Sequence, residues 1–165
     1  MPAHPSPRRS ARVVRFEREL GQRQEGLMGS LDLAVTDVEA GRRKGFTWTG
    51  GYKFDIDDPR TMDLLYETMR IRGLDVLYVV ARTNRTLGEW RARGSPRDIG
   101  YNFGIGAWLD TDSGETYVDD IFIQDYPRDE ESAVRLGRKY SQKYILKVDG
   151  RTRSYEFIPT GVDVK

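Results

Sequence analysis

The sequence predicts an α+β domain with a mainly antiparallel sheet and two helices on one face, preceded by a basic N-terminal arm. Three observations predict this class. Residues 98–110 and 115–124 alternate as two long strands joined by a turn. A shorter hairpin pattern lies on each side of this pair, and helical periodicity follows Asp58 and Asp129, a residue type that caps helix starts. Alternating hairpins and helices favour a sheet with helices segregated to one face.

Residues 1–45 are expected to form the basic arm, with a short helix or strand within it. Six arginines and three prolines precede residue 24, and no acid comes before Glu17. A segment of this composition is expected to be disordered on its own. Residues 30–41 fit either an alternating strand or a helix ended by Gly41, and the helix is favoured.

The α+β domain is expected to span residues 46–158, with a tail at 159–165. Its first hairpin is predicted to turn over a three-residue loop, Thr49 to Gly51. This loop pairs Trp48 with Tyr52 and places both rings on one face of the sheet.

A helix is predicted to follow, with Asp58 as its cap, Pro59 in its first turn and Gly73 at its end. The apolar run 74–81 is typical of a strand in the middle of a sheet. The helix is expected to bury one stripe, formed by Met62, Leu65, Tyr66 and Met69.

The next segment begins with Thr86 and Glu89, which form a capping box for one or two helical turns. In the long strand after it, residues with rings or branched side chains alternate with small residues. One face of this strand, which includes Gly104 and Gly106, is therefore nearly bare. Glycine at these places indicates a curved sheet or a close approach by another backbone. Residues 112–114 supply the turn to the next strand.

The chain closes with a helix from Asp129 and a hairpin turned by Asp149-Gly150. Both halves show a hairpin, a D-x-P-R segment, a helix and a strand, the D-x-P-R segments being residues 57–60 and 125–128. This order fits an internal duplication of a ββαβ unit or a coincidence, and coincidence is favoured.

Composition excludes several kinds of chemistry. The 27 Lys and Arg nearly balance the 26 Asp and Glu, so no global field attracts nucleic acid or a membrane. The chain has no Cys, and its one His, His4, lies in the arm, so thiol and histidine catalysis have no candidate in the fold. No apolar run long enough for a membrane span occurs. We expect a cytoplasmic protein without a cofactor.

A nucleic-acid site is one functional hypothesis. Arginines surround Trp90 just before the aromatic strand, and together they offer phosphate contacts beside rings for base stacking. The alternative interpretation places the rings in the core and the arginines in a solvated loop. The candidate residues are Arg82, Arg85, Trp90, Arg91, Arg93, Arg97, Tyr101 and Phe103.

Two enzyme hypotheses are weaker. Asp110, Asp112, Asp119 and Asp120 are candidate ligands for a divalent metal, but an acid-x-Lys pair typical of nucleases occurs only at residues 163–165. The order of elements is similar to that of GNAT-type acetyltransferases, yet acids replace the glycine-rich cradle for the cofactor pyrophosphate. Absence of catalysis is therefore favoured.

The run DEESAVRLGRKYSQKYILKVDG, residues 129–150, resembles a segment of small accessory proteins of phages and mobile elements. This resemblance implies a protein that occupies a host protein or decorates a virion. We therefore expect a non-catalytic binding protein with a protein partner, which includes a second copy of the chain. The arm, through Arg8, Arg9 and Arg12, and an aromatic edge are the expected contacts; RNA or single-stranded DNA is the alternative ligand.

Overall fold

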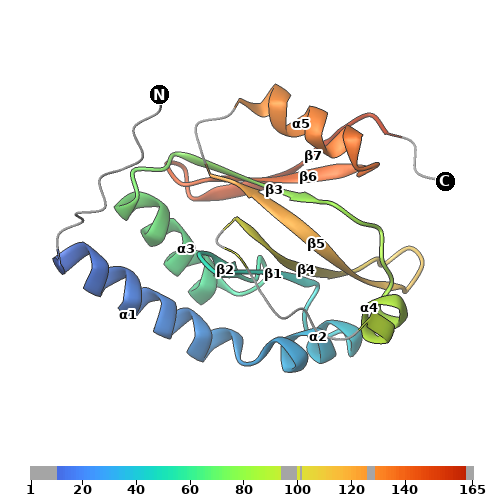
Figure 1. The fold of residues 1–165 in the computed structure, drawn as a ribbon, viewed down its shortest axis with the longest axis horizontal. Helices are drawn as coiled ribbons and strands as arrows, with labels where there is room; N and C mark the ends of the chain where they lie inside the picture. The colour runs from blue at the N-terminus through green and yellow to red at the C-terminus, as the bar shows by residue number, and fades with distance from the viewer. Residues whose placement is uncertain (1–10, 94–99, 101, 126–128, 163–165) are drawn as a thin grey trace.

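The computed structural model describes residues 11–93, 100, 102–125 and 129–162. Seven strands form one antiparallel sheet in the order β2-β1-β4-β5-β3-β6-β7, and Figure 1 shows how strongly this sheet curls. The predicted α+β class with an antiparallel sheet is confirmed. The strands are β1 (Gly45–Thr49), β2 (Lys53–Phe54), β3 (Val76–Ala81), β4 (Phe103–Leu109), β5 (Thr116–Gln124), β6 (Tyr144–Asp149) and β7 (Ser154–Pro159). The helices are α1 (Ala11–Met28), α2 (Leu31–Glu39), α3 (Pro59–Ile71), α4 (Leu87–Arg93) and α5 (Glu130–Lys139).

The predicted helix starts are confirmed by hydrogen bonds. Asp58 and Asp129 each accept a backbone N–H from the first turn of their helix, at 3.0 and 2.8 Å. Thr86 and Glu89 bond reciprocally, as a capping box requires. Gly73 has a φ of 67°, which lets the chain leave α3.

The two longer predicted helices, α3 and α5, cover opposite faces of the sheet and do not share one (Figure 1). Leu77 and Val79 of β3 pack against α3, whereas Tyr78 and Val80 pack against Ala133 of α5. Successive strand residues point to opposite faces, so the apolar run of β3 needs a cover on both sides.

Residues 11–28 of the arm, expected to be disordered on its own, form α1, and the helix favoured over residues 30–41 is confirmed as α2. Leu20 and Met28 of α1 are buried, and α2 begins at Ser30, whose hydroxyl accepts from the backbone N–H of Leu33. Both helices contribute to a core on the same face as α5, so the packed body begins well before residue 46. That core contains Met28, Ala34, Val35, Val38, Phe46, Trp48, Leu87, Trp90, Ile105, Ala107 and Val118.

The first hairpin has a different register from the predicted one. Trp48 lies opposite Lys53, so Trp48 and Tyr52 point to opposite faces of the sheet. The cause is Thr49, whose backbone N–H donates to the Tyr52 carbonyl at 2.8 Å and whose hydroxyl accepts from the Tyr52 N–H at 2.7 Å. These bonds close a two-residue loop, Gly50-Gly51, which is one residue shorter than the predicted loop.

The element order expected from a duplication is present, as β1-β2-α3-β3 and β4-β5-α5-β6. The sheet arranges the two sets differently. One strand lies between β5 and β6, whereas three strands lie between β2 and β3. Part of the second D-x-P-R segment, residues 126–128, lies outside the described residues. The duplication is therefore not shown by the fold.

The predicted close approach at the bare face of β4 is confirmed. A Cβ at Gly104 would lie 2.6 Å from Thr49 Cγ2 and even closer to the Trp48 carbonyl oxygen. A Cβ at Gly106 would lie 2.8 Å from Ile121 Cγ2. The absence of these side chains lets β1 approach β4 closely where the sheet curls.

We expect Gly104→Ala to destabilise the protein by about 3 kcal/mol, because backbone atoms of β1 must move to accept the methyl group. Gly100→Ala is the matched control, since its Cβ would meet Phe103 only at 3.7 Å and beyond. The control should stay within about 0.5 kcal/mol of the wild type in chemical denaturation. Equal stability of the two variants would contradict the close approach.

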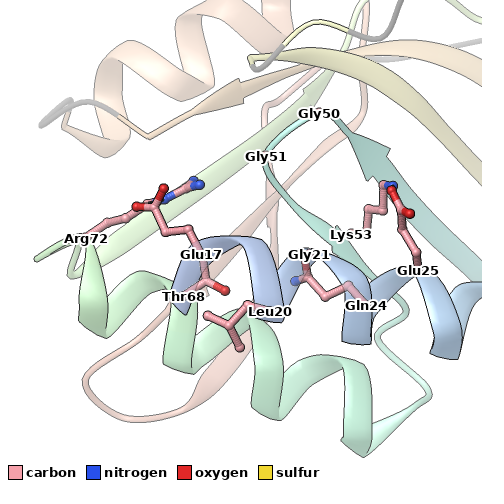
Figure 2. Close-up of a pocket in the computed structure, with 10 residues that line it drawn as sticks. All are labelled: Glu17, Leu20, Gly21, Gln24, Glu25, Gly50, Gly51, Lys53, Thr68 and Arg72. Atoms are coloured by element: carbon pink, nitrogen blue, oxygen red, sulfur yellow. Dashed lines mark hydrogen bonds and ion pairs between the residues drawn. The ribbon is translucent and has the colours of Figure 1, made fainter. Parts of the chain in front are cut away.

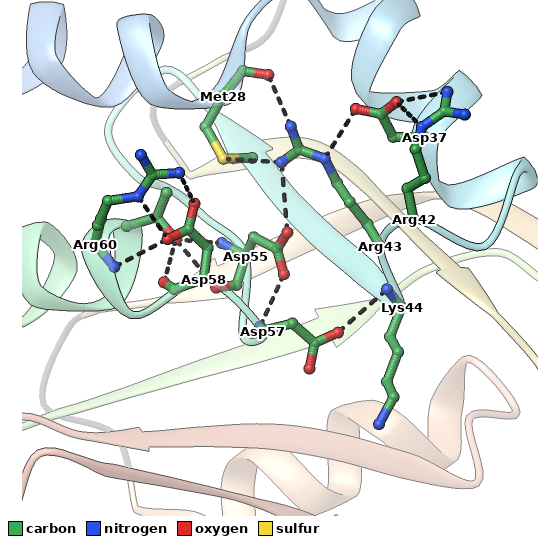
Figure 3. Close-up of polar contacts among 10 residues, drawn as sticks. Met28, Asp37, Arg42, Arg43, Lys44, Asp55, Asp57, Asp58 and Arg60 are labelled. Atoms are coloured by element: carbon green, nitrogen blue, oxygen red, sulfur yellow. Dashed lines mark hydrogen bonds and ion pairs between the residues drawn. The ribbon is translucent and has the colours of Figure 1, made fainter.

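Arg43 joins the ends of both N-terminal helices to the loop before α3 (Figure 3). Its guanidinium lies 3.3 Å from Asp37 Oδ2 and 3.4 Å from Asp55 Oδ2, and it donates to the Met28 carbonyl at 3.5 Å. Burial raises the pKa of Asp55, while hydrogen bonds from Arg42 and then Arg43 lower the pKa of Asp37. The backbone N–H of Asp57 and, after it, the charge of Arg43 partly offset the effect of burial on Asp55.

Replacing Arg43→Met should destabilise the fold by about 3 kcal/mol, since it leaves the buried Asp55 carboxylate without its cation. The double variant Arg43→Met/Asp55→Asn should recover at least about 1 kcal/mol of that loss. Chemical denaturation of the wild type, both single variants and the double variant measures this coupling. Strict additivity of the two substitutions would show that the pair does not interact.

Candidate binding surfaces

The arginines and rings predicted to bind nucleic acid do not form one surface. Trp90 is buried against α2 and cannot stack on a base. Arg91 makes two hydrogen bonds of 3.1 Å to Glu39, and Arg85 bonds to Asp120 at 3.0 Å. Three of the predicted contacts are thus used within the fold.

The remaining predicted residues have varied positions. Arg12 on α1 and Arg93 at the end of α4 are exposed. Arg8, Arg9, Arg97 and Tyr101 lie outside the described residues. Arg82 and Phe103 come together on the α5 face of the sheet.

Arg82 forms the centre of a cation–aromatic surface. Its guanidinium carbon lies 4.5 Å from the ring centroid of Phe122, 5.6 Å from that of Phe103 and 5.9 Å from that of Tyr140. Lys139 Nζ lies 5.5 Å from the Tyr140 ring. We call these five residues, Arg82, Phe103, Phe122, Lys139 and Tyr140, the Arg82 cluster.

The Arg82 cluster is open to solvent. Arg82 and Lys139 are exposed, and 49% of Phe103 is accessible. Asp120 lies opposite Arg82 on the neighbouring strand β5, but its carboxylate pairs with Arg85 instead. Among the described residues, no acceptor bonds to the Arg82 guanidinium, and none of them occupies the donors that a ligand would use.

A second open surface lies on the last two strands. Tyr144 of β6 and Tyr155 and Phe157 of β7 are 55%, 41% and 53% exposed. The pairings Tyr144 with Pro159 and Leu146 with Phe157 place these rings on the face that carries α3. Grouped exposed apolar side chains of this kind mark interaction surfaces. We call the outer side of β7 with these three rings the β7 edge.

The outer backbone of the β7 edge pairs with no other described strand, because β7 ends the sheet. The Thr160 N–H donates inward to the Lys143 carbonyl at 2.9 Å. Backbone groups of a strand alternate in direction, so the N–H groups of Ile158 and Glu156 also face β6, and those of Tyr155 and Phe157 face outward. An added strand would find its donors and acceptors at Tyr155 and Phe157.

A small polar pocket lies between α1, α3 and the β1–β2 turn (Figure 2). Gln24 lines it with a buried side-chain nitrogen that has no hydrogen-bond partner among the described residues, and Lys53 pairs with Glu25 at 2.6 Å. The cavity volume is about 80 Å³. Pockets for small organic ligands have roughly 300–1,000 Å³, so this pocket is too small for a cofactor.

The four aspartates considered as metal ligands do not converge. Asp110 accepts from the backbone of Asp112 within the β4–β5 turn. Asp119 and Asp120 are adjacent in β5 and therefore point to opposite faces. Over the part of the chain that the structure describes, no group of three or more His, Cys, Asp or Glu residues is placed to hold a metal ion.

Asp119 is fully buried beside the segment that follows β3. Its Oδ1 accepts from the Thr83 hydroxyl and from the Arg85 N–H, both at 2.6 Å. Its Oδ2 has no partner among the described residues. Burial raises the pKa of Asp119 to about 6, against the lowering effect of these two hydrogen bonds. Asp119 is a structural anchor for the segment after β3.

Comparisons with known proteins find no match to this chain among protein families, curated proteins or solved structures. Among the described helices, none has the length and apolar character needed to cross a membrane. Function therefore has to be inferred from the two open surfaces.

Sequence reasoning missed several members of these surfaces. Phe122 and Tyr140 lie 19 and 37 residues after Phe103 in the sequence; the β4–β5 pairing brings Phe122 to Phe103, and the packing of α5 on the sheet brings Tyr140 to Phe122. The sequence did contain a signal for the β7 edge, since Tyr155 and Phe157 alternate with polar residues in the last hairpin.

The buried Asp119 should make stability depend on pH. Because its pKa is raised in the folded state, the folded protein keeps a proton that the unfolded chain has released between pH about 4 and about 6. The free energy of unfolding should therefore fall as the pH rises through this window, by about 3 kcal/mol from this group. Asp119→Asn, measured by chemical denaturation across this window, should lack that fall.

The control for this experiment is Asp112→Asn, which changes an exposed carboxylate in the β4–β5 turn. It should keep the wild-type pH profile. Parallel profiles for Asp119→Asn and the wild type would contradict the assignment of the effect to Asp119.

Proposed function

We propose that this protein is a non-catalytic interaction protein that associates through the β7 edge, and that the strand added there is β7 of a second copy. The observation that supports this proposal is a six-residue strand with an unpaired outer side and two half-exposed rings. Soluble proteins normally protect such edges, because an open edge accepts another strand. Cyclic dimers are the commonest oligomers.

The sequence of β7 suits pairing with itself. In an antiparallel pair centred on Glu156, Tyr155 of each copy lies opposite Phe157 of the other. Both residues have outward N–H and C=O groups, so they form the hydrogen-bonded positions of this pair. The two aromatic pairs lie on one face and add cross-strand stabilisation.

The opposite face carries the unfavourable part of this pairing, because the two Glu156 side chains meet at the centre. Lys147 lies 3.9 Å from Glu156 in each copy and reduces their repulsion. The edge is short, and such small interfaces form weak complexes, so we expect a Kd in the micromolar range or above. A weak self-association leaves the edge available to exchange partners.

The resemblance of residues 129–150 to phage and mobile-element accessory proteins gives this proposal a biological context. An interaction protein of that class occupies a host or virion protein, and the same edge would accept a strand of that partner. A metal-dependent nuclease is less well supported, because the candidate aspartates serve the turn and the buried anchor. An acyltransferase has no observed cofactor cradle among the described residues.

The proposed association is tested by substitutions with opposite expected effects. Phe157→Lys should weaken dimerisation at least about tenfold, because it removes both aromatic pairs and adds two like charges. Glu156→Gln should strengthen it about two- to fivefold, because it removes the central repulsion. Sedimentation equilibrium over a range of protein concentrations measures both effects.

Leu33→Lys is the matched control, since Leu33 is an equally exposed apolar residue on α2. It should dimerise as the wild type does. A wild-type protein that stays monomeric at every accessible concentration, or a Glu156→Gln variant that associates more weakly, would refute the pairing.

A further inference from the structure

We infer that the Arg82 cluster binds single-stranded nucleic acid, with a base stacked on Phe103 and phosphates bound by Arg82 and Lys139. This surface uses the α5 face of the sheet, whereas the β7 edge uses backbone groups and rings on the α3 face. The inference is therefore independent of the proposed self-association.

The guanidinium of Arg82 is fixed in place before a ligand arrives. Its carbon lies 4.5 Å from the centroid of Phe122, and the Phe103 and Tyr140 rings flank it. Stacking on rings limits the motion of the side chain but uses none of its N–H donors. A phosphate can accept two of these donors at once, which makes a stacked arginine a strong phosphate ligand.

Phe103 supplies the stacking surface. Its ring packs against Phe122 at 5.1 Å with a 59° tilt, while about half of the residue remains accessible. An unpaired base presents a free face to such a ring, whereas bases inside a duplex are covered by their neighbours. The geometry therefore favours a single strand over a duplex.

A second cation extends the site along a nucleic-acid backbone. Lys139 Nζ lies 5.5 Å from the Tyr140 centroid, and the Arg82 guanidinium carbon lies 5.9 Å from the same ring. Both cations therefore flank one ring at the end of α5. The carboxylate of Asp120, the residue opposite Arg82 on β5, pairs with Arg85 at 3.0 Å. The local charge is positive although the whole chain carries only +1.

An acidic protein segment could also neutralise these cations, but it would leave the exposed Phe103 ring without a stacking partner. The two classes of ligand differ in what Phe103 does. For a nucleic acid, the ring contributes about 1–3 kcal/mol per stacked base. For a polyanion bound by charge alone, the ring contributes little.

The test is fluorescence anisotropy of a labelled oligouridylate, an oligothymidylate and a duplex, each about 12 nucleotides long, titrated with the full chain at several salt concentrations. Both single strands should bind more tightly than the duplex. Phe103→Ala should weaken single-strand binding about tenfold with an unchanged salt dependence. Arg82→Gln should weaken it by a similar factor and also reduce the salt dependence.

Arg70→Ala is the matched control, because it removes an exposed arginine from α3 on the other face. Its binding should equal that of the wild type, and thermal melting should confirm that every variant is folded. Equal losses for Arg70→Ala and Arg82→Gln, an unchanged Phe103→Ala, or equal competition by polyglutamate would overturn the inference. So would the absence of single-strand binding at low salt.

Discussion

The close contact between β1 and β4 is the constraint on which the shape of this protein depends. Gly104 and Gly106 carry no side chain where the backbone of β1 and the Ile121 side chain approach β4. The sheet can therefore curl. Helix α3 packs on one of its faces, and α2 and α5 pack on the other. With larger residues at these two positions, the same strands would have to separate, and the β1–β4 pairing would weaken.

The curled sheet ends differently at its two edges. β2 is a two-residue strand, and α1 lies beside it, with Lys53 and Glu25 paired across the gap. A short, covered strand of this kind is protected from pairing with another chain. β7 has six residues, and no described element covers its outer side. The fold thus concentrates its capacity for strand addition at one edge.

Much of the fold could be predicted because local signals set the elements. The caps at Asp58 and Asp129 and the apolar run of β3 located helices and strands within a few residues. The helix α1 was missed because its arginines dominate the composition, although the buried Leu20 and Met28 lie eight residues apart, a spacing that suits one helical face. Which face of the sheet α3 and α5 each cover depends on the order of all the strands, and short-range sequence patterns do not contain that order.

The candidate sites were less predictable, because their members meet only through tertiary structure. Arginines close to Trp90 in sequence are held by Glu39 and Asp120, acids from distant elements. Among the described members of the predicted group, only Arg82 and Phe103 meet on an open surface, and their neighbours come from β5 and the end of α5. Surface exposure and ion pairing decided which residues remain free, and neither property is visible in spacing alone.

The most direct test of association through the β7 edge is amide hydrogen exchange of individual β7 residues as a function of protein concentration. Pairing with a second copy protects the outward N–H groups of Tyr155 and Phe157. We predict that exchange at these two amides slows as concentration rises, while the inward amide of Glu156, already bonded to β6, changes much less. Exchange at Tyr155 and Phe157 that does not depend on concentration would contradict the account.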